Sequence, residues 1–366
     1  MYYVIFLVGL VGGLAAALLV RRLRSRLGGA ASSRLAGRHV FITGGSKGIG
    51  LELAKLVLAR GAHVTLVARH RDDLERAKLA LIKRCPSPAT QHVQAYSVDV
   101  GDSSSAGVTL ERIIAEAEHR SGPISTLACC AGTAIAKTFE ATSSAEFRQM
   151  MDVNYFGTVA TVKAALGSLK RNGADGGGGG QVLLFSSLAG LFGLYGYAAY
   201  AASKFALVGF AEVLQMELRP HRISVTVAFP PDTDTPGYER EQVGKPEITK
   251  RISEEGGLVA PAVVAERALA DTLAGEFVSS VGLNGFVLTS LCAGMMPTRS
   301  WALRVAQVAT MSLLRVVGLH FLSTCERTVL KMEKEGSEEK KKEEKEEKAE
   351  ENEAEEEKEK EPKKAK

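Results

Sequence analysis

Residues 39–58 read HVFITGGSKGIGLELAKLVL, a strand pattern joined to a helix pattern by a glycine-rich loop. Apolar residues 40–42 are typical of a buried strand, and the apolar residues of the second half recur at helical spacing. Gly44, Gly48 and Gly50 allow a sharp turn and leave no Cβ in the way of a pyrophosphate. The first N–H groups of a helix have no partners within it, so a phosphate is favoured there. The stretch therefore predicts a dinucleotide-binding loop, against the alternative of a tight turn that binds nothing.

Strand and helix patterns alternate along the following two hundred residues or so. Helical spacing is found in residues 104–119 and 145–169, between short β-branched and apolar runs. Alternation of this kind predicts an α/β fold with a doubly wound parallel sheet, whose two faces are covered by helices. The further strands are expected at residues 63–68, 94–98, 126–131, 181–186 and 223–229.

The N-terminus has the pattern of a membrane anchor. Residues 1–20 carry no charged side chain, and a helix of this length spans ~30 Å, the thickness of a bilayer core. Four arginines follow between positions 21 and 26, whereas a cleavable signal peptide has its positive charge in front. The positive-inside rule then places the rest of the chain in the cytosol. We expect an N-terminal transmembrane helix in residues 1–27 and a linker in residues 28–36, the alternative being a buried core helix.

Composition and charge exclude several classes of function. The net charge is +4, and residues 331–366 alone contain 12 Lys and 16 Glu, so the remainder is basic. No basic patch with interleaved aromatic residues indicates nucleic acid, and basicity beside a membrane segment suits an anionic leaflet. The five cysteines are odd in number and lack metal-ligand spacing. We therefore expect no metal site and a reducing compartment.

Tyr200 and Lys204 form a candidate acid–base pair in the sequence YAASK. They stand four residues apart at the start of an expected helix, so both side chains face the same way. A phenol has a pKa near ~10, and a cation fixed beside it brings that pKa toward neutral pH. Alone, this spacing is common by chance and indicates packing more often than catalysis.

Together with the loop TGGSKGIG, four residues resemble the short-chain dehydrogenase/reductase family, whose glycine loop is Thr-Gly-x-x-x-Gly-x-Gly. Asn154, Ser187, Tyr200 and Lys204 match the catalytic tetrad of that family in order, and Ser187 precedes Tyr200 by the usual thirteen residues. The resemblance implies a Rossmann-type catalytic domain, which we place at residues 37–276.

The resemblance also implies a role for each member of the tetrad. The serine would polarise the substrate carbonyl, and Tyr200 would donate the proton. Lys204 would bind the nicotinamide ribose and lower the pKa of the tyrosine, while Asn154 would hold a water of the proton relay. The neighbouring Ser186 is an alternative for the serine. One departure is Cys129, where the family often has Asn, which leaves the hydrogen bonding at that strand end open.

The residues after the second expected strand favour NADPH as the cofactor. An enzyme that binds NAD usually has an acidic residue there for the ribose 2′-hydroxyl, but this chain has Arg69, and its glycine loop carries Lys47. Two cations at one ribose suit the 2′-phosphate of NADPH. The alternative is a pair of solvated surface cations. Asp99 resembles the adenine-contacting Asp of the family, and the remaining expected cofactor-binding residues are Gly44, Ser46, Gly48, Ile49, Gly50, Tyr200 and Lys204.

A narrower resemblance concerns the substrate. Residues 227–237, VAFPPDTDTPG, resemble the branch of the family that reduces the ketone of 3-ketosphinganine in sphingolipid synthesis. This resemblance implies a long-chain ketone lipid as substrate and the endoplasmic reticulum membrane as location, with the catalytic domain facing the cytosol. Two alternatives stay open. One is a steroid or retinoid reductase of the same family, and the other is a catalytically silent, nucleotide-binding membrane scaffold.

The C-terminal part divides into an apolar and a charged region. Residues 277–330 are apolar, but Arg304 and Arg315 interrupt their longest helical pattern and share one side of a helix. This disfavours a plain span and favours a membrane-associated helix or the packing surface of a homo-oligomer. Residues 331–366 are a Lys/Glu-rich tail, either disordered or a single charged helix. Its last residues, KKAK, resemble a dilysine retrieval signal, although a lysine pair arises easily in such a tail.

Overall fold

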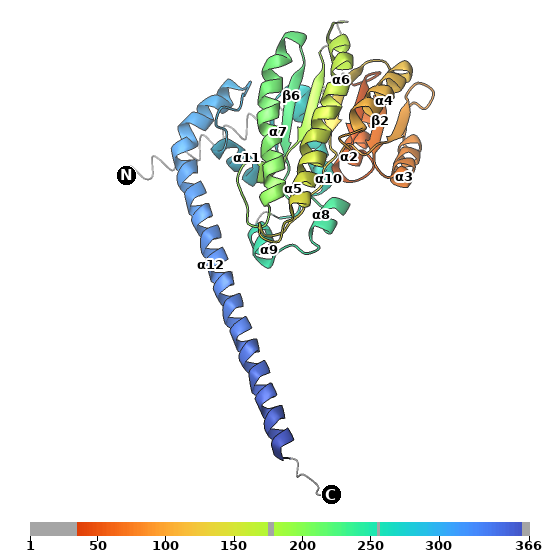
Figure 1. The fold of residues 1–366 in the computed structure, drawn as a ribbon. Coiled ribbons are helices and arrows are strands. Elements are labelled where there is room, and N and C mark those ends of the chain that lie inside the picture. The colour runs from red at the N-terminus through yellow and green to blue at the C-terminus, as the bar shows by residue number, and fades with distance from the viewer. Residues whose placement is uncertain (1–34, 175–178, 255–256, 361–366) are drawn as a thin grey trace, which may run out of the picture. The chain divides into compact units, whose positions relative to one another are not determined.

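The computed structural model describes residues 35–174, 179–254 and 257–360 (Figure 1). The expected N-terminal anchor and the KKAK sequence lie outside these residues. The chain divides into two compact units at the peptide between Arg315 and Val316, and each unit is considered by itself.

The first unit is built on a seven-stranded sheet in which all neighbouring strands are parallel. The strand order is β3-β2-β1-β4-β5-β6-β7, so the chain changes direction across the sheet between β1 and β4. Ligands of such sheets bind beyond the carboxyl ends of the strands at this switch point. The strands are β1 (His39–Thr43), β2 (His63–Ala68), β3 (Val93–Ser97), β4 (Ile124–Cys129), β5 (Gln181–Phe185), β6 (Ser224–Phe229) and β7 (Val278–Ser280).

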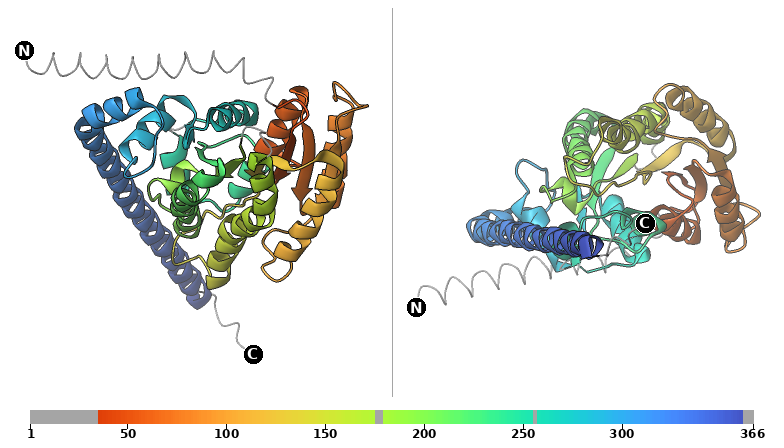
Figure 2. Two further views of the ribbon diagram at one scale, coloured as in Figure 1. Left: turned by 90° about the horizontal axis from the view of Figure 1, so that it is seen from above. Right: turned by 60° about the horizontal axis from the view of Figure 1, so that its bottom comes forward.

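Two layers of helices cover the sheet, as Figures 1 and 2 show. Side chains alternate along β1: Phe41 packs on one layer, whereas Val40 and Ile42 pack on the other. The doubly wound parallel sheet expected from the sequence is therefore confirmed. The first layer contains α4 (Ala106–Ser121), α6 (Gly157–Ala174) and α7 (Ala198–Glu217), and the second contains α2 (Gly48–Ala59), α3 (Arg71–Ile82) and α10 (Pro261–Ala274).

Short elements connect these layers, and one of them replaces part of an expected helix. Instead of one helix over residues 145–169, the chain forms α5 (Ser144–Met150), a π-helical segment η2 (Met151–Phe156) and then α6. The other short elements are η3 (Leu188–Gly190), η4 (Arg219–His221), α8 (Pro236–Glu241), α9 (Glu247–Glu254) and α11 (Gly282–Leu291).

The sheet extends into residues 277–330, beyond the domain boundary expected after residue 276. The three residues of β7 pair with β6, and Phe277 in front of them is buried in the core. A strand of three residues carries too little periodicity to be recognised, and apolar residues around it resemble a membrane-associated region equally well.

Helix α12 (Trp301–Lys360) begins in the first unit, and it forms the whole described part of the second. Among the described residues, its segment Leu303–Glu338 is the one stretch long and apolar enough to cross a membrane. The charged tail, for which disorder and a single helix were both open, is helical as far as Lys360. Pairs four residues apart support the helix, with nitrogen–oxygen distances of 3.6 Å for Lys331–Glu335 and 4.0 Å for Lys334–Glu338.

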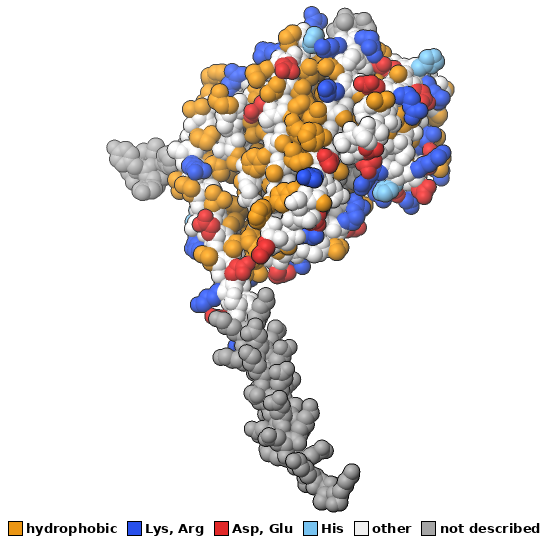
Figure 3. Space-filling model, in the orientation of Figure 1, with side chains coloured by type: hydrophobic (Ala, Val, Ile, Leu, Met, Phe, Trp, Pro, Cys, Tyr) orange, Lys and Arg blue, Asp and Glu red, His pale blue; other side chains and the backbone are white. Residues whose placement is uncertain are grey.

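The surface over α6 and α7 is notably apolar (Figure 3). On α7, Phe205, Val213 and Met216 are exposed. Contiguous apolar surface of this kind marks an interaction face more often than single exposed residues do. A homo-oligomer stays a prediction, and α7 is a second candidate surface for it beside residues 277–330.

His39 is a buried titratable group at the start of β1, with 1% of its surface exposed. Its Nδ1 lies 2.8 Å from the carbonyl oxygen of Gly122, and its Nε2 lies 2.9 Å from Thr65 Oγ1. A carbonyl oxygen only accepts, so Nδ1 carries the proton and Nε2 accepts from the hydroxyl. Burial lowers the pKa of His39 to about 4 because the charged ring is desolvated.

We expect His39 to make the protein less stable as the pH falls below neutral. Its folded pKa lies below the unfolded value, so the unfolded chain binds the proton more readily; the contribution is complete above pH 6.5 and is lost toward pH 4. Between pH 7 and pH 5 the loss should be about 2 kcal/mol. Thermal unfolding of wild type and His39→Asn at both pH values measures it. The variant should lose much of this pH dependence, whereas His119→Asn, at an exposed position, should keep it; identical pH profiles for wild type and His39→Asn would contradict the assignment.

Candidate active site

The glycine loop between β1 and α2 packs so closely that its glycines are required sterically. Gly44 has φ +67°, and a Cβ there would lie 2.6 Å from the backbone nitrogen of Ala131. Gly48 also has a positive φ, of +54°. A Cβ on Gly50 would lie 2.4 Å from the carbonyl oxygen of Gly44. The loop therefore brings bare backbone to the first turn of α2, as a phosphate cradle needs.

Gly45 was not among the expected loop residues, although it is under the same steric constraint. A Cβ at this position would lie 2.7 Å from Leu66 Cδ2, and the N–H of Gly45 donates to the carbonyl oxygen of Val67 at 3.3 Å. Ser46 follows it in the same loop, and Ile49 in the first turn of α2 packs against the core. The doubled glycine in TGGS was the sequence feature that could have indicated this constraint on Gly45.

Lys47 and Arg69 each pair with a carboxylate. Lys47 Nζ lies 2.6 Å from Asp73 Oδ2, and Arg69 lies 3.6 Å from Asp99 Oδ2. Asp73 also pairs with Arg76, and the hydrogen bond from Lys47 is the main reason that its pKa is lowered. The carboxylate of Asp73, which comes from α3, was not expected beside these cations. Both expected cations nevertheless stay about half exposed, Lys47 at the N-cap of α2 and Arg69 directly after β2.

Tyr200 and Lys204 lie on the first turns of α7, and the two serines after β5 have different partners. The side chain of Ser187 lies beside the phenol of Tyr200 and acts to lower the pKa of that phenol. Ser186 is buried, and its hydroxyl instead donates to the carbonyl oxygen of Lys204 at 2.9 Å. Of the two candidates, the structure therefore brings Ser187 to the phenol and leaves Ser186 with the helix backbone.

The protonation state of this pair follows from burial. Lys204 Nζ lies 5.6 Å from the centroid of the Tyr200 ring and donates to the carbonyl oxygen of Phe185 at 2.9 Å. Burial lowers the pKa of Lys204 to about 8 and raises the pKa of Tyr200, which the side chain of Ser187 opposes. A cation beside the phenol was expected to bring its pKa down, but desolvation dominates here. The phenol is thus protonated at neutral pH and is suited to donate a proton.

Asn154 lies in the π-helical segment η2 and is fully buried. Its Oδ1 accepts from the N–H of Thr133 at 2.9 Å, and its Nδ2 donates to Ser203 Oγ at 2.9 Å. A Cβ on Gly132 would lie 3.2 Å from Asn154 Oδ1 and 3.5 Å from Lys204 Nζ. Asn154 and Lys204 therefore meet across Gly132, and a π-helical turn at this position is typical of a functional site.

The end of β4 keeps its hydrogen bonds to β1 without the usual Asn. The N–H of Cys130 donates to the carbonyl oxygen of Thr43 at 3.1 Å, and that of Ala131 lies 3.4 Å from Thr43 Oγ1. Cys129 is buried, and desolvation raises the pKa of its thiol to about 12. Cys129 is therefore an inert packing residue, and backbone groups provide the contact that was open.

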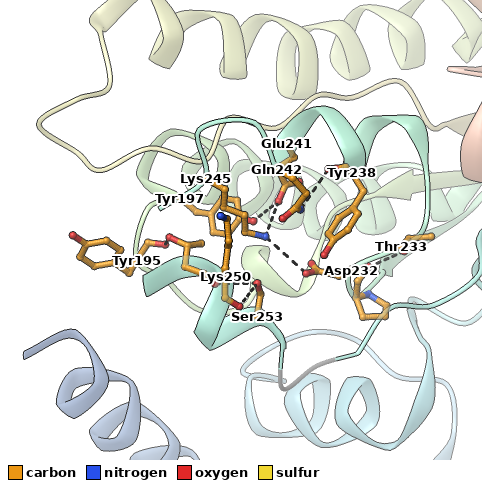
Figure 4. A network of polar contacts seen from close by, with 12 residues as sticks. Tyr195, Tyr197, Asp232, Thr233, Tyr238, Glu241, Gln242, Lys245, Lys250 and Ser253 are labelled. Carbon is orange, nitrogen blue, oxygen red and sulfur yellow. Dashed lines mark hydrogen bonds and ion pairs between the residues drawn. The ribbon is translucent and has the colours of Figure 1, made fainter. Parts of the chain in front are cut away.

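A buried polar network beside Tyr200 was not expected from the sequence (Figure 4). It joins Asp232, Glu241 and Lys245 around the rings of Tyr197 and Tyr238. The doubled proline and DTDTPG were the available signal, but they gave no indication of Glu241 or Lys245, which lie further along the chain.

The segment that carries this network also closes over the glycine loop. Thr235 caps the N-terminus of α8 by accepting from the N–H of Tyr238 at 3.1 Å. A Cβ on Gly48 would lie 3.0 Å from the Thr235 methyl group. Residues 230–235 thus run from the end of β6 to the phosphate cradle, where they can cover a bound nucleotide.

A parallel sheet with this strand order, a glycine cradle at β1 and a Ser–Tyr–Lys group at β5 and α7 define a nucleotide-dependent oxidoreductase. Residues 38–244 match the family described as short chain dehydrogenase, and this chain belongs to that family. Membership implies a nicotinamide cofactor, which the cradle fits.

The chain is also similar to individual members of the family. It is 39% identical over 296 residues to 3-dehydrosphinganine reductase of Danio rerio, covering 81% of this chain and 86% of that one. It is 40% identical over 295 residues to 3-ketodihydrosphingosine reductase of Bos taurus, with the same coverage. The crystal structure of levodione reductase shares the fold, with a TM-score of 0.59 and 23% identity over 68% of this chain and 96% of that one.

Proposed function

We propose that this protein reduces the ketone of 3-ketosphinganine to the alcohol with NADPH, giving sphinganine. The observation that carries the reaction type is the placement of Ser187 beside the protonated phenol of Tyr200, with Lys204 next to the same ring. The substrate rests on the relatives, which are named for this ketone and are about 40% identical over four-fifths of the chain.

The roles that we propose for the residues follow from their contacts. Ser187 and Tyr200 both donate to the carbonyl oxygen of the substrate, and Tyr200 then transfers its proton to that oxygen. Lys204 stabilises the phenolate by its charge and reaches the ribose of the cofactor. Asn154 holds the segment around Gly132 in place and supports the proton relay. When bound, the reduced nicotinamide supplies the hydride to the carbonyl carbon.

We expect Tyr200→Phe to abolish reduction of 3-ketosphinganine while cofactor binding stays largely intact. The phenylalanine ring packs equally well but has no proton to donate. Consumption of NADPH with the full-length protein in detergent measures turnover, and cofactor fluorescence measures binding. Tyr96→Phe is the matched control, because it removes a phenol that bonds to Gln94 on β3. Turnover of Tyr200→Phe near the wild-type value would show that the proton comes from another group.

The same assay distinguishes the alternative functions. Wild-type protein that reduces a steroid or retinoid ketone but not 3-ketosphinganine would establish the other substrate class. Wild-type protein that binds NADPH and oxidises none with any of these ketones would establish the silent scaffold.

We propose NADPH rather than NADH because of Lys47 and Arg69. Both side chains are about half exposed, Lys47 at the N-cap of α2 and Arg69 directly after β2, so they can turn to a 2′-phosphate. Asp73 offsets part of this charge but is itself held by Arg76 as well as Lys47. The group Lys47, Arg69 and Arg76 against Asp73 and Asp99 keeps one excess positive charge for the phosphate.

Loss of Arg69 should weaken NADPH binding more than NADH binding. A charge-assisted hydrogen bond contributes ~1.5–3 kcal/mol, or about tenfold or more in affinity. We expect Arg69→Ala to raise the apparent KM for NADPH by that factor and to leave the KM for NADH nearly unchanged. Arg84→Ala removes an exposed arginine further along the chain and should change neither value. Equal use of the two cofactors by the wild type would exclude the proposed preference.

We propose that the protein is anchored in the endoplasmic reticulum membrane with its catalytic domain in the cytosol. Residues 1–27 are the anchor, and the arginines after the apolar run set the orientation. The catalytic domain begins at residue 37 and extends past the expected boundary at residue 276 to include β7; the membrane-associated region follows within residues 277–330, and residues 331–366 are a cytosolic tail. The helical segment Leu303–Glu338 supports membrane association by its length and composition. A long alkyl chain keeps the substrate in the bilayer, so its reductase works at that surface.

Protease treatment of sealed microsomes tests this orientation. A cytosolic catalytic domain should be digested without detergent, whereas a lumenal marker stays intact until detergent is added. A catalytic domain that resists digestion under these conditions would overturn the orientation. Replacing Lys363 and Lys364 by serine tests the retrieval signal separately, because the anchor can hold the protein without it.

A further inference from the structure

A buried charged network borders the candidate active site (Figure 4). The side chain of Lys245 is fully buried, and its Nζ lies 3.4 Å from Glu241 Oε1 and 4.0 Å from Asp232 Oδ2. The same nitrogen lies 5.5 Å from the ring centroids of both Tyr197 and Tyr238. Lysine is rarely buried in this way unless its charge is paired, so the network is a built feature of the fold.

Two sets of contacts connect this network to the phenol of Tyr200. The hydroxyl of Tyr197 donates to Glu241, and the rings of Tyr197 and Tyr200 lie 5.6 Å apart. The N–H of Leu188, the residue after Ser187, donates to the carbonyl oxygen of Pro230 at 3.2 Å. Asp232 therefore follows closely on a segment that is hydrogen bonded beside the reacting serine. Consistent with this placement, the charges of Glu241 and Asp232 both raise the pKa of Tyr200.

The network has one more carboxylate than cation. Glu241 is satisfied by Lys245 and by the hydroxyl of Tyr197, and 13% of its side chain is exposed. Asp232 has the longer contact to Lys245, and 31% of its side chain is exposed, so a ligand can reach it. Burial and the charge of Glu241 raise the pKa of Asp232. A second cation beside Asp232 would stabilise its charged form.

The substrate proposed above carries such a cation. 3-Ketosphinganine has a primary amine on the carbon next to its ketone, whereas steroid and retinoid ketones have none. When Ser187 and Tyr200 hold the ketone oxygen, the neighbouring ammonium must lie within a few ångströms of that oxygen. The excess carboxylate follows the end of β6, close enough to the phenol of Tyr200 for its charge to raise the pKa of that phenol.

We propose that Asp232 binds the ammonium group of the substrate and thereby orients the ketone toward Tyr200. The proposal rests on the proposed function and names the feature that selects an amino ketone over other long-chain ketones. Lys245 is a positioning residue, since it holds Glu241 and Asp232 together. The specificity arises because a neutral ketone leaves the excess carboxylate without its cation.

The test compares two ketones with the full-length protein in detergent and saturating NADPH. One is 3-ketosphinganine, and the other is 1-hydroxyoctadecan-3-one, which has the same chain and ketone but no amine. We expect kcat/KM of the wild type to be at least about tenfold higher for the amino ketone. Asp232→Asn should lose this preference through a higher KM for the amino ketone, with little change for the other substrate.

Two further variants separate a substrate contact from a structural role. Asp232→Glu keeps the charge and should restore part of the preference. Glu247→Gln removes an exposed carboxylate that pairs with Lys250 on α9 and should leave both substrates unchanged. The melting temperature and NADPH affinity of each variant show whether it is folded.

The outcomes distinguish this inference from the proposed function. Equal kcat/KM of the wild type for the two ketones would overturn the role of Asp232 and leave the reductase function standing. A loss of activity in Asp232→Asn that is the same for both ketones would also overturn it, because the residue would then act on Tyr200 or on the fold. Wild-type protein that reduces neither ketone would overturn the inference together with the function.

Discussion

The close packing of Gly44 against the end of β4 is the contact on which the site depends. At this point the backbone of the glycine loop meets the peptide between Cys130 and Ala131, with no room for a Cβ. The hydroxyl of Thr43 accepts from the N–H of this peptide, and its carbonyl oxygen accepts from the N–H of the preceding peptide, at Cys130. Because β1 and β4 are the strands between which the chain changes direction across the sheet, this contact fixes the switch point beside the first turn of α2.

A series of short contacts connects this switch point to the residues that we propose to be catalytic. Gly132 directly follows the peptide between Cys130 and Ala131 that Gly44 touches, and it separates Asn154 from Lys204. Lys204 is fixed in turn by the carbonyl oxygen of Phe185, the last residue of β5. A shift of β4 relative to β1 would therefore displace the lysine and the neighbouring phenol together. The proposed phosphate cradle and the proposed proton donor are therefore both positioned by the carboxyl ends of β1, β4 and β5, although they are far apart in the sequence.

Local spacing explains which parts of the site the sequence predicts. The glycines of the loop and the pair Tyr200 and Lys204 each lie within one turn or one helix, so their geometry follows from a few neighbouring residues. The choice between Ser186 and Ser187 depends on which of the two hydroxyls donates to the backbone of α7, and no local pattern shows this. The ion pair between Asp73 and Lys47 likewise shows in no local pattern, because Asp73 lies on α3 and Lys47 precedes α2.

The fold shows the same division between local and long-range information. Five of the six strands expected from sequence are long apolar runs whose burial on both faces makes them recognisable, and β3 is a partly exposed edge strand found within a residue of its expected place. The three residues of β7 are defined only by pairing with β6, and η2 is defined only by its hydrogen-bond register. The charged network around Lys245 is another long-range feature, and in the arrangement that we propose it affects proton transfer from Tyr200. Burial is the main reason that the pKa of Tyr200 is raised, and the charges of Glu241 and Asp232 raise it further; a substrate ammonium beside Asp232 would offset the effect of these charges. The phenol of Tyr200 would then release its proton more easily with the amino ketone bound than in the free protein or with a neutral ketone bound.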